Sequence, residues 1–376
     1  MLSASETERE RIVIVSFGGG VDSTVILAAY LNPSLFMETI RKMGKEITLE
    51  EFQIVFPPLT SVMFSDPGSE YAHTYRNVRY AESLCKTAGI EFMTVRLMKD
   101  GKPYKIFDWL TDKNRGRGLL PLIPGSGQHT CSNKFKGAVM QAKGDELYGK
   151  DTPKTWLIGI EANEKKRTDR FTMNKDQKKT SNEFRYPLME LGLTREDCQE
   201  VLRRMGWILP AEGNQPEIEV GKSSCAWCPF IKEWEIHQLF ELATKENADS
   251  HDVRLLQEAF EIEDYFTNST KDGLNLHDAW HNDGEPLRGG KNRENRELSI
   301  SIKDYKSLSR EEKKEWTRPQ AAWGYHSQPF QSGECGEPSC LHFGPHPEGA
   351  ATLVALKKDG SRKTFKEWFE EWKEQF

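Results

Sequence analysis

The sequence has few of the features that mark membrane, secreted or disordered proteins. Its 376 residues contain no uncharged apolar run of about 18 residues, so we expect no transmembrane helix. The N-terminus is acidic and polar, without the basic start and apolar centre of a secretory signal. Hydrophobic residues make up 37% of the chain, which is enough to bury sizeable cores. We therefore expect a cytoplasmic protein of two or three domains with no membrane partner.

Charge of one sign does not dominate the chain. Lys and Arg total 52 while Asp and Glu total 58, so the formal net charge is −6. This balance argues against a protein that coats nucleic acid, but local basic surfaces remain compatible with it. Residues 99–150 and 164–185 are basic, whereas 241–285 contain 12 acidic and 3 basic residues. We expect the acidic segment to form a solvated helical face or a partner surface.

Cysteines are too few, and odd in number, for a disulfide framework. The chain contains 7 of them and shows no sign of export. Cys225 and Cys228 form a CxxC pair, a spacing that lets one metal ion or cluster bind both sulfurs. Cys85 and Cys198 lie within helical patterns, where we expect them to pack in a core.

Short apolar segments alternate with helical patterns in the first half of the chain. We expect strands near 11–17, 59–65, 90–97 and 155–160. Such alternation predicts an α/β fold with a mostly parallel sheet, for which we expect five strands and helices on both faces. A helical cysteine-bearing region and a C-terminal extension would follow. The predicted division is 1–205, 206–300 and 301–376.

A glycine loop joins the first strand to the first helix. The segment SFGGGVDST at 16–24 places three consecutive glycines before Asp22 and Ser23. Glycines let the backbone approach a phosphate, and the N–H groups of the loop and the helix start then face the anion. The loop has no Lys for a Walker A pattern, and Ser23 stands where GxGxxG needs its third glycine. Neither of these familiar phosphate loops fits.

The loop resembles that of the PP-loop ATP pyrophosphatase superfamily, whose pattern is SGGxDS. Residues 19–23 match its last five positions, with Gly18 in place of the leading Ser and Ser16 two residues upstream. The resemblance implies a Rossmann-like nucleotide-binding domain whose loop wraps the pyrophosphate part of ATP. Such enzymes cleave ATP between the α and β phosphates, and charge neutralisation by Mg²⁺ suits that chemistry.

Further segments are similar, in the same order, to the phosphoadenosine phosphosulfate (PAPS) reductase-like branch of that superfamily. They are FSDPGSE at 64–70, TCSNKFK at 130–136, GIEANE at 159–164, YPL at 186–188 and KSSCxxCP at 222–229. The resemblance covers about residues 11–235. It implies a nucleotide site, with Asp22 and Ser23 also catalytic, formed by Ser16, Gly18, Gly19, Gly20, Val21, Asp22, Ser23, Asp66, Lys134, Lys136, Gly159 and Arg170.

The same resemblance implies a role for three cysteines. Some relatives that transfer sulfur hold a [4Fe–4S] cluster with three cysteine ligands, which leaves one iron open. Cys131, Cys225 and Cys228 fit that arrangement. One alternative is structural zinc with His129 or Cys198 as the fourth ligand. Another is a set of unligated thiols packed in a core.

A second cysteine motif lies near the C-terminus. The segment SGECGEPSCLH at 332–342 begins like the ECGLH motif of PAPS reductases, whose cysteine attacks sulfur, but four residues interrupt the pattern. Cys335 is therefore a candidate nucleophile or resolving thiol, with a neighbouring His to lower its pKa. The alternatives are a second metal site with His342 or His346, or a structural loop.

The two basic segments follow predicted strand ends and would flank the nucleotide site. They would neutralise pyrophosphate or receive a polyanion such as DNA or RNA. Trp109, Phe135 and Phe171 lie in or near them and are candidates for stacking on bases. The alternative is a solvated, lysine-rich surface.

Together these motifs predict an ATP-dependent enzyme of sulfur chemistry. ATP would adenylylate an acceptor, with nucleic acid among the candidates, and sulfur from a donor such as a cysteine desulfurase would then displace AMP. One alternative is a PAPS or APS reductase with Cys335 as nucleophile, which would bind PAPS in place of ATP. The near-intact loop favours ATP, because such reductases usually have a degenerate loop. Another alternative is a non-catalytic nucleotide-binding subunit of a modification or phage-defence complex.

Overall fold

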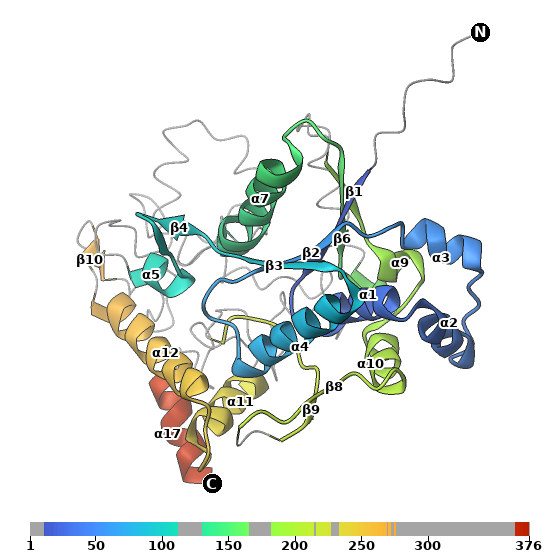
Figure 1. Cartoon of the computed structure of the whole chain (residues 1–376). Coiled ribbons are helices and arrows are strands. Elements are labelled where there is room, and N and C mark those ends of the chain that lie inside the picture. Colours follow the sequence, from blue (N-terminus) through green and yellow to red (C-terminus); the bar gives the residue numbers. More distant parts are fainter. Residues whose placement is uncertain are drawn as a thin grey trace, which may run out of the picture. The chain divides into compact units, whose positions relative to one another are not determined.

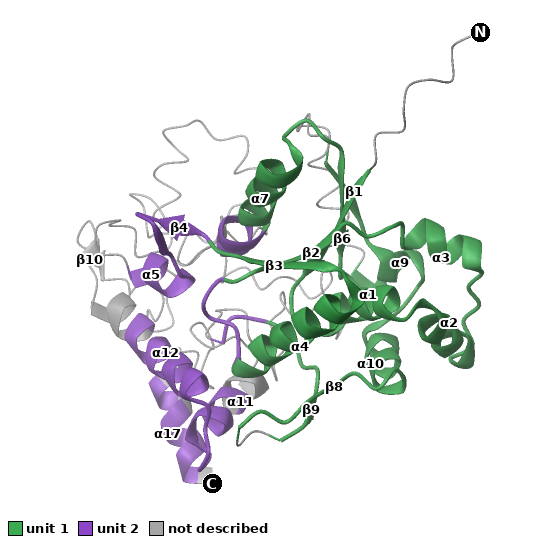
Figure 2. Ribbon diagram, in the orientation of Figure 1, with its two compact units in different colours: residues 1–66, 72–96, 137–223 green, residues 67–71, 97–136, 224–376 purple. Residues whose placement is uncertain are grey.

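The protein divides into two compact units that interleave along the sequence (Figure 2). The computed structural model describes residues 11–111, 130–164, 182–213, 216–226, 233–268, 270–271, 274–275 and 365–375. Unit 1 comprises Met1–Asp66, Ala72–Arg96 and Gly137–Ser223, and unit 2 comprises Pro67–Tyr71, Leu97–Lys136 and Ser224–Phe376. The predicted break after 205 stays a prediction, and the one after 300 lies outside the described residues.

A parallel sheet of five strands forms the centre of unit 1 (Figure 1), in the order β3-β2-β1-β6-β7. The strands are β1 (Ile12–Phe17), β2 (Ser61–Ser65), β3 (Glu91–Val95), β6 (Lys154–Ile158) and β7 (Asn182–Arg185). The predicted α/β class and parallel sheet are confirmed. The sequence analysis expected a fifth strand but did not place it. This strand is β7, whose residues NEFR form no apolar run and are only half-buried at the sheet edge.

The order of the strands reverses beside β1. From β1 the chain moves through β2 to β3, and it then returns to the other side of β1 through β6 and β7. In open parallel sheets, ligands bind outside the carboxyl ends of the strands at such a reversal. The glycine loop follows β1 and Gly159 follows β6, so both lie at this point.

Helices cover both faces of the sheet, as predicted. They are α1 (Val21–Leu31), α2 (Pro33–Lys42), α3 (Leu49–Val55), α4 (Ala72–Ala88), α7 (Ala138–Tyr148), α9 (Pro187–Glu190) and α10 (Arg195–Arg204), with a 3₁₀ turn η3 (Ala162–Glu164) and a hairpin β8 (Ile208–Leu209) and β9 (Ile218–Glu219). Val13, Val15 and Phe17 of β1 pack with α1, α4 and α10, whereas Ile14 packs on the face that α7 covers. Alternate side chains of a strand point to opposite faces, which explains this division.

The described part of unit 2 is mainly helical. Its elements are the hairpins β4 (Met98–Lys99) with β5 (Lys102–Pro103) and β10 (Thr270–Lys271) with β11 (Leu274–Asn275), and α5 (Ile106–Thr111), α6 (Thr130–Ser132), the π-helical turn η2 (Asn133–Gly137), α11 (Glu233–Thr244), α12 (Ser250–Asn268) and α17 (Phe365–Gln375). Phe369 of α17 contacts Phe240 of α11 and Phe260 of α12. None of the helices in the described ranges is both long and apolar enough to cross a membrane.

The N-terminus of α10 offers a test of the local stability of unit 1. A capping box fixes it, since the Thr194 hydroxyl accepts the Asp197 N–H and the Asp197 carboxylate accepts the Thr194 N–H. We predict that Thr194→Ala lowers the free energy of unfolding by about 1 kcal/mol, because it removes the hydroxyl that accepts the Asp197 N–H, while the backbone N–H of residue 194 can still donate to the Asp197 carboxylate. Thr194→Ser keeps the hydroxyl and should retain most of the stability. Urea unfolding checks this, and equal midpoints for the Ala variant and the wild type would contradict it.

Candidate functional site

The glycine loop forms the first candidate site, at the carboxyl end of β1. Strand β1 ends at Phe17, residues 18–20 form the loop, and α1 begins at Val21. A Cβ atom at Gly159, just after β6, would stand 2.6 Å from the backbone nitrogen of Ser23. The end of β6 therefore packs directly on the first turn of α1, and only glycine fits at position 159.

Two glycines of the loop are also closely packed by their surroundings. Gly19 has a φ of +75°, and a Cβ atom there would stand 2.8 Å from Cγ2 of Thr74. A Cβ atom at Gly20 would stand 3.0 Å from the backbone nitrogen of Ser223. The KSSC segment picked out in the sequence thus packs against the loop through Ser223. A side chain at either glycine would force these neighbouring segments apart.

The Ser23 hydroxyl closes the loop on itself. Its Oγ accepts the Gly18 N–H at 3.0 Å and donates to the Gly20 carbonyl at 3.2 Å. The Thr24 hydroxyl donates to the same carbonyl at 2.8 Å. The two hydroxyls therefore hold the Gly20 carbonyl toward α1, and the Ser23 hydroxyl also holds the Gly18 amide.

Helix α1 begins without a side-chain cap. Asn32, Thr48 and Thr194 cap α2, α3 and α10 with side-chain oxygens, whereas Gly20 at the start of α1 has no side chain to do so. Within the described ranges, the amides of Gly19 and Gly20 donate to no acceptor. Uncapped amides at a helix start, together with the helix dipole, favour an anion such as phosphate.

Two buried carboxylates lie beside the start of α1. Asp22 forms an ion pair with Arg195 at 2.7 Å. Glu161 Oε2 accepts the Asn163 N–H at 2.8 Å, while Oε1 has no hydrogen-bond partner among the described residues. Burial raises the pKa of Glu161 above its ordinary value, against the opposing Asn163 N–H, and Glu164 adds to the rise. Glu161 is therefore poised to gain from a proton or a cation.

Asp66, predicted as a nucleotide ligand, follows β2 at the same edge of the sheet. Its carboxylate accepts the Tyr75 hydroxyl at 2.6 Å and Arg96 Nε at 2.8 Å. These bonds tie the ends of β2 and β3 to α4. The described contacts of Asp66 are thus to protein groups, and its role toward a nucleotide stays a prediction.

Two other predicted nucleotide contacts flank the loop: Ser16 lies in β1, before it, and Val21 begins α1, after it. The Ser16 hydroxyl contacts Met140 Sδ of α7 at 3.6 Å, on the side of β1 that α7 covers. Val21 is buried as the first residue of α1. A contact of Val21 with a nucleotide would therefore come from its backbone amide.

The second candidate site lies in unit 2, around Lys136. The Lys136 ammonium donates to Oε1 of the fully buried Glu70 at 2.6 Å. Residue 70 also pairs with Cys225 in an antiparallel bridge. Burial alone would lower the pKa of Lys136, but Glu70, Cys225 and Cys131 outweigh it and raise the pKa. Two of the three predicted cysteine ligands therefore lie near one ammonium group.

The π-helical turn η2 helps to bring Cys131 and Lys136 together. These residues are five positions apart, and the chain between them runs through η2. In a π-helix each N–H bonds the carbonyl five residues earlier, so residues five apart approach one face, whereas in an α-helix neighbours are three or four apart. Burial raises the pKa of Cys131 to about 11, although the Ser132 N–H and Lys136 oppose this.

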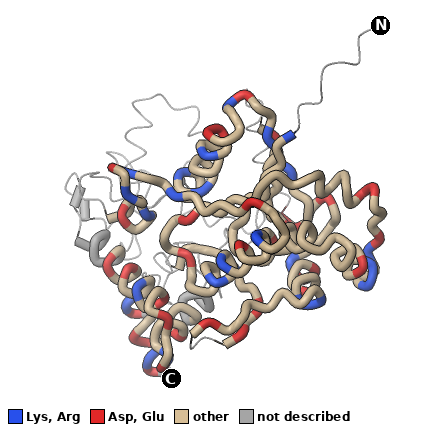
Figure 3. The backbone as a smooth tube through the Cα atoms, viewed as in Figure 1, with Lys and Arg blue, Asp and Glu red and all other residues tan. Residues whose placement is uncertain are grey.

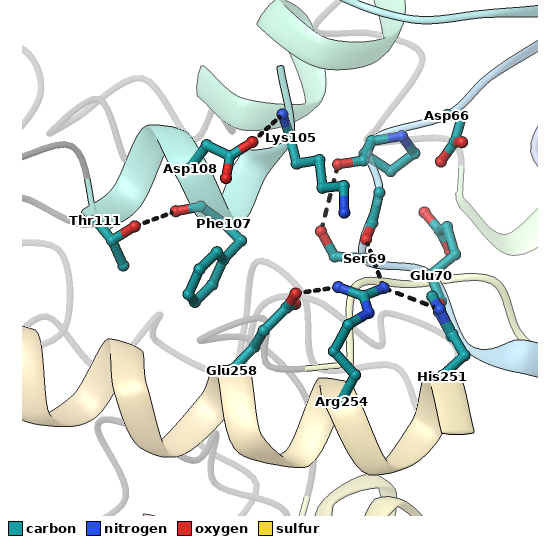
Figure 4. Close-up of polar contacts among 12 residues, drawn as sticks. Asp66, Ser69, Glu70, Lys105, Phe107, Asp108, Thr111, His251, Arg254 and Glu258 are labelled. Carbon is teal, nitrogen blue, oxygen red and sulfur yellow. Dashed lines mark hydrogen bonds and ion pairs between the residues drawn. The ribbon is translucent and has the colours of Figure 1, made fainter. Parts of the chain in front are cut away.

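Helix α12 holds the loop that carries Glu70 (Figure 4). The ring Nε2 of His251 lies 2.6 Å from the Glu70 carbonyl. Arg254, paired with Glu258, donates to His251 Nδ1 at 2.9 Å and to the Gly68 carbonyl at 3.3 Å. Because Nδ1 accepts from Arg254, Nε2 carries the His251 proton and donates it to the Glu70 carbonyl. The backbone around Glu70 is therefore fixed from two side chains of α12.

The predicted basic and aromatic surface is only partly as expected. The Lys134 ammonium lies over the Trp109 ring, 5.2 Å from its centroid. Phe135 is fully buried and packs against Trp109, so its ring is not available to stack on a base. Figure 3 shows charges of both signs interspersed along the described helices. Cation–π pairing is thus the described role of Lys134, and its contact with a nucleotide stays a prediction.

Several predicted residues lie outside the described ranges. They are Cys228, His129, Arg170, Phe171, Cys335, His342 and His346. Among the residues that the structure does describe, no three Cys, His, Asp or Glu side chains form a group that could hold a metal ion. Cys85 and Cys198 are fully buried, as predicted for core residues. The metal prediction therefore rests on Cys131 and Cys225 in the structure and on Cys228 in the sequence.

Three residues of the loop site carried no signal that the sequence prediction used. They are Arg195, which pairs with Asp22, and Asn77 with Trp207, which bond to each other at 3.0 Å. Each lies in an ordinary helical or apolar pattern far from the glycine loop in sequence. Only the capping box before Arg195 could have marked that residue as the start of a helix.

Comparison with known proteins adds no family. No family model matches the sequence, and no curated protein is similar enough to count as a relative.

The raised pKa of Glu161 gives a prediction about stability and pH. A carboxyl whose pKa is raised on folding costs stability once the pH exceeds its ordinary value of 4.5, and the full cost is reached above the folded pKa. We predict that Glu161→Gln raises the midpoint of thermal unfolding at pH 7, and that the gain shrinks as the pH falls toward 5. The Gln carbonyl still accepts the Asn163 N–H.

The exposed Glu46 provides the matched control. Glu46→Gln should leave the midpoint nearly unchanged across the same pH range, because an exposed carboxyl keeps its hydration. Equal behaviour of the two variants would contradict the burial cost assigned to Glu161.

Proposed function

We propose that the protein is an ATP-dependent PP-loop enzyme that adenylylates an acceptor and then transfers sulfur to it. The observation that carries the proposal is the uncapped start of α1. It lies behind three glycines at the reversal point of a parallel sheet, where the amides of Gly19 and Gly20 donate to no acceptor among the described residues. Backbone amides gathered in this way bind phosphate groups.

The loop would hold the pyrophosphate part of ATP. Its amides and the first amides of α1 would contact phosphate oxygens, and the Ser23 hydroxyl would exchange its bond to Gly20 for one to a phosphate. Asp22 and Glu161 supply carboxylate oxygens of the kind that Mg²⁺ prefers, and Glu161 Oε1 has no partner in the described structure. Bound Mg²⁺ would neutralise the charge that develops as pyrophosphate leaves. Coordination of Mg²⁺ by the Glu161 carboxylate would offset the free-energy cost of burying that negative charge.

The cysteine site would supply the sulfur chemistry. Cys131 and Cys225 both lie near the Lys136 ammonium, and Cys228 is three residues beyond Cys225 in the sequence, so one metal centre held by these three thiols is our proposal. A [4Fe–4S] cluster on three cysteines supplies an iron with an open position for sulfur, whereas zinc would serve structure. Lys136, held by Glu70, would balance the negative charge of the thiolates.

The overall reaction balances in two steps. An oxygen of the acceptor attacks the α phosphate of ATP and expels pyrophosphate, and sulfur at the level of sulfide then displaces AMP. A donor protein such as a cysteine desulfurase would bring the sulfur as a persulfide, and two electrons from a reductant would convert it to sulfide. Nucleic acid remains our candidate acceptor, and the basic segments are its candidate contacts.

The loop assignment is tested by two substitutions. Ser23→Ala and Asp22→Asn should each lower ATP-dependent pyrophosphate release by about a hundredfold or more, because they remove a loop hydroxyl and a candidate Mg²⁺ ligand. Ser83→Ala on α4 is the matched control, since that hydroxyl bonds only the Tyr80 carbonyl among the described residues. Turnover that survives in both loop variants would rule out the assignment. Thioredoxin-dependent sulfite release from PAPS, lost in Cys335→Ser, would favour the reductase instead.

The role of Lys136 is tested by measuring metal content and ATP affinity separately in the same variants. Lys136→Met and Glu70→Gln should each lower the iron and sulfide, or zinc, retained after anaerobic purification, and leave the ATP dissociation constant within about twofold. Lys143→Met is the control, because Lys143 pairs with the exposed Glu146 on α7. If Lys136 binds the nucleotide directly, the ATP dissociation constant will rise while the metal content stays unchanged.

A further inference from the structure

Asn77 of α4 is a fully buried amide beside the glycine loop. Its Nδ2 donates to the Gly19 carbonyl at 2.9 Å and to the Thr24 hydroxyl at 2.8 Å. Its Oδ1 accepts the indole N–H of Trp207 at 3.0 Å. One side chain from a distant segment therefore contacts both the loop and the first turn of α1.

The orientation of the Asn77 amide follows from its partners. The indole nitrogen of Trp207 can only donate, so it must face Oδ1, and Nδ2 must then face Gly19 and Thr24. The Thr24 hydroxyl receives one amide hydrogen and passes its own hydrogen to the Gly20 carbonyl at 2.8 Å. The amide, the hydroxyl and the two loop carbonyls form one continuous network. Every donor in it has an acceptor, so the amide has a single favourable orientation.

The bond to the Gly19 carbonyl also fixes an amide that faces the other way. No peptide bond in the described chain is cis, so the Gly19 carbonyl and the Gly20 N–H point in opposite directions across their planar peptide. Holding the carbonyl toward α4 therefore turns the Gly20 N–H away from α4. Glycine would otherwise allow this peptide to rotate, because it adopts positive and negative φ with similar ease.

We infer that Asn77 is a positioning residue for the phosphate loop, which it acts on through the Gly19 carbonyl and Thr24. This inference rests on the proposed function, since it names the group that presents the Gly20 amide to a phosphate. Trp207 fixes the Asn77 amide in turn, and Tyr80 packs edge-on against the Trp207 ring at 5.6 Å. Preorganised amides bind an anion without first having to be ordered.

The test compares Asn77→Leu with Tyr148→Phe. Leu has the same branched shape and the same number of side-chain heavy atoms as Asn but no polar group, whereas Tyr148→Phe removes one hydrogen bond, of 2.9 Å to Ser61, on the face that α7 covers. Both are measured well below their unfolding temperatures, with ATP binding by calorimetry and amide hydrogen exchange of the 18–24 segment. For Asn77→Leu we expect an ATP dissociation constant about tenfold higher and exchange of the segment about tenfold faster. Tyr148→Phe should change neither by more than about twofold.

The outcomes separate this inference from the proposed function. If Asn77→Leu loses only stability, with the exchange and ATP affinity of the control, Asn77 is a structural residue and the inference fails. Weaker ATP binding with unchanged exchange of the loop would overturn it as well. If the wild type binds no ATP, the proposed function fails, and the exchange measurement still decides whether Asn77 orders the loop. Asn77→Ser, which is smaller, replaces the Leu variant if that one does not fold.

Discussion

The structure of unit 1 depends on a helix that starts without a cap. Helix α1 begins directly after three glycines, and its N-cap residue, Gly20, has no side chain to accept the first amides of the helix. Such amides cost free energy if they are buried unpaired, and they become useful if an anion joins them. Gly19 has a φ of +75°, which favours glycine, and a Cβ atom at Gly20 would stand 3.0 Å from the backbone nitrogen of Ser223, so that this neighbour would have to shift. The same residues that leave the helix without a side-chain cap therefore also allow the close packing around the loop.

The surroundings of the loop come from segments that are distant in sequence. Arg195 of α10 pairs with Asp22, Asn77 of α4 holds the Gly19 carbonyl, and Gly159 after β6 lets the backbone of α1 approach. Each contact restrains a different atom of the loop. A loop of glycines loses much conformational entropy on ordering, so outside restraints of this kind are needed to keep it in one conformation.

At the cysteine site, the arrangement of the side chains depends on the balance of buried charges. Glu70 is fully buried, and its carboxylate is balanced by Lys136 at 2.6 Å. That ammonium group also acts on Cys131 and Cys225, which the π-helical turn and the antiparallel bridge bring to it. Removing one member of a buried ion pair leaves the other charge uncompensated, so Glu70 and Lys136 depend on each other. The Lys136 ammonium therefore lies near both thiols while its own charge is balanced by Glu70.

The sequence by itself determined the α/β class, the parallel sheet and the position of the glycine loop. Each of these follows from local pattern: apolar runs of strand length, helical periodicity between them, and consecutive glycines at a strand end. Cys85 and Cys198 were recognised as core residues from the same periodicity. The position of strand β7 was not predicted, because its four residues are charged or polar in part and only half-buried. Pairing with β6 in the folded protein decided its conformation.

Only the tertiary structure decided which side chains surround the two sites. Asn77, Arg195 and Trp207 have no motif, because their roles depend on where α4, α10 and the chain after α10 pack. Phe135 was a candidate for base stacking by residue type, yet it is fully buried against Trp109. Residue type and spacing set what a side chain can do, whereas packing sets which partner it meets. Long-range contacts have no local signature, and for that reason the loop was readable in the sequence and its supports were not.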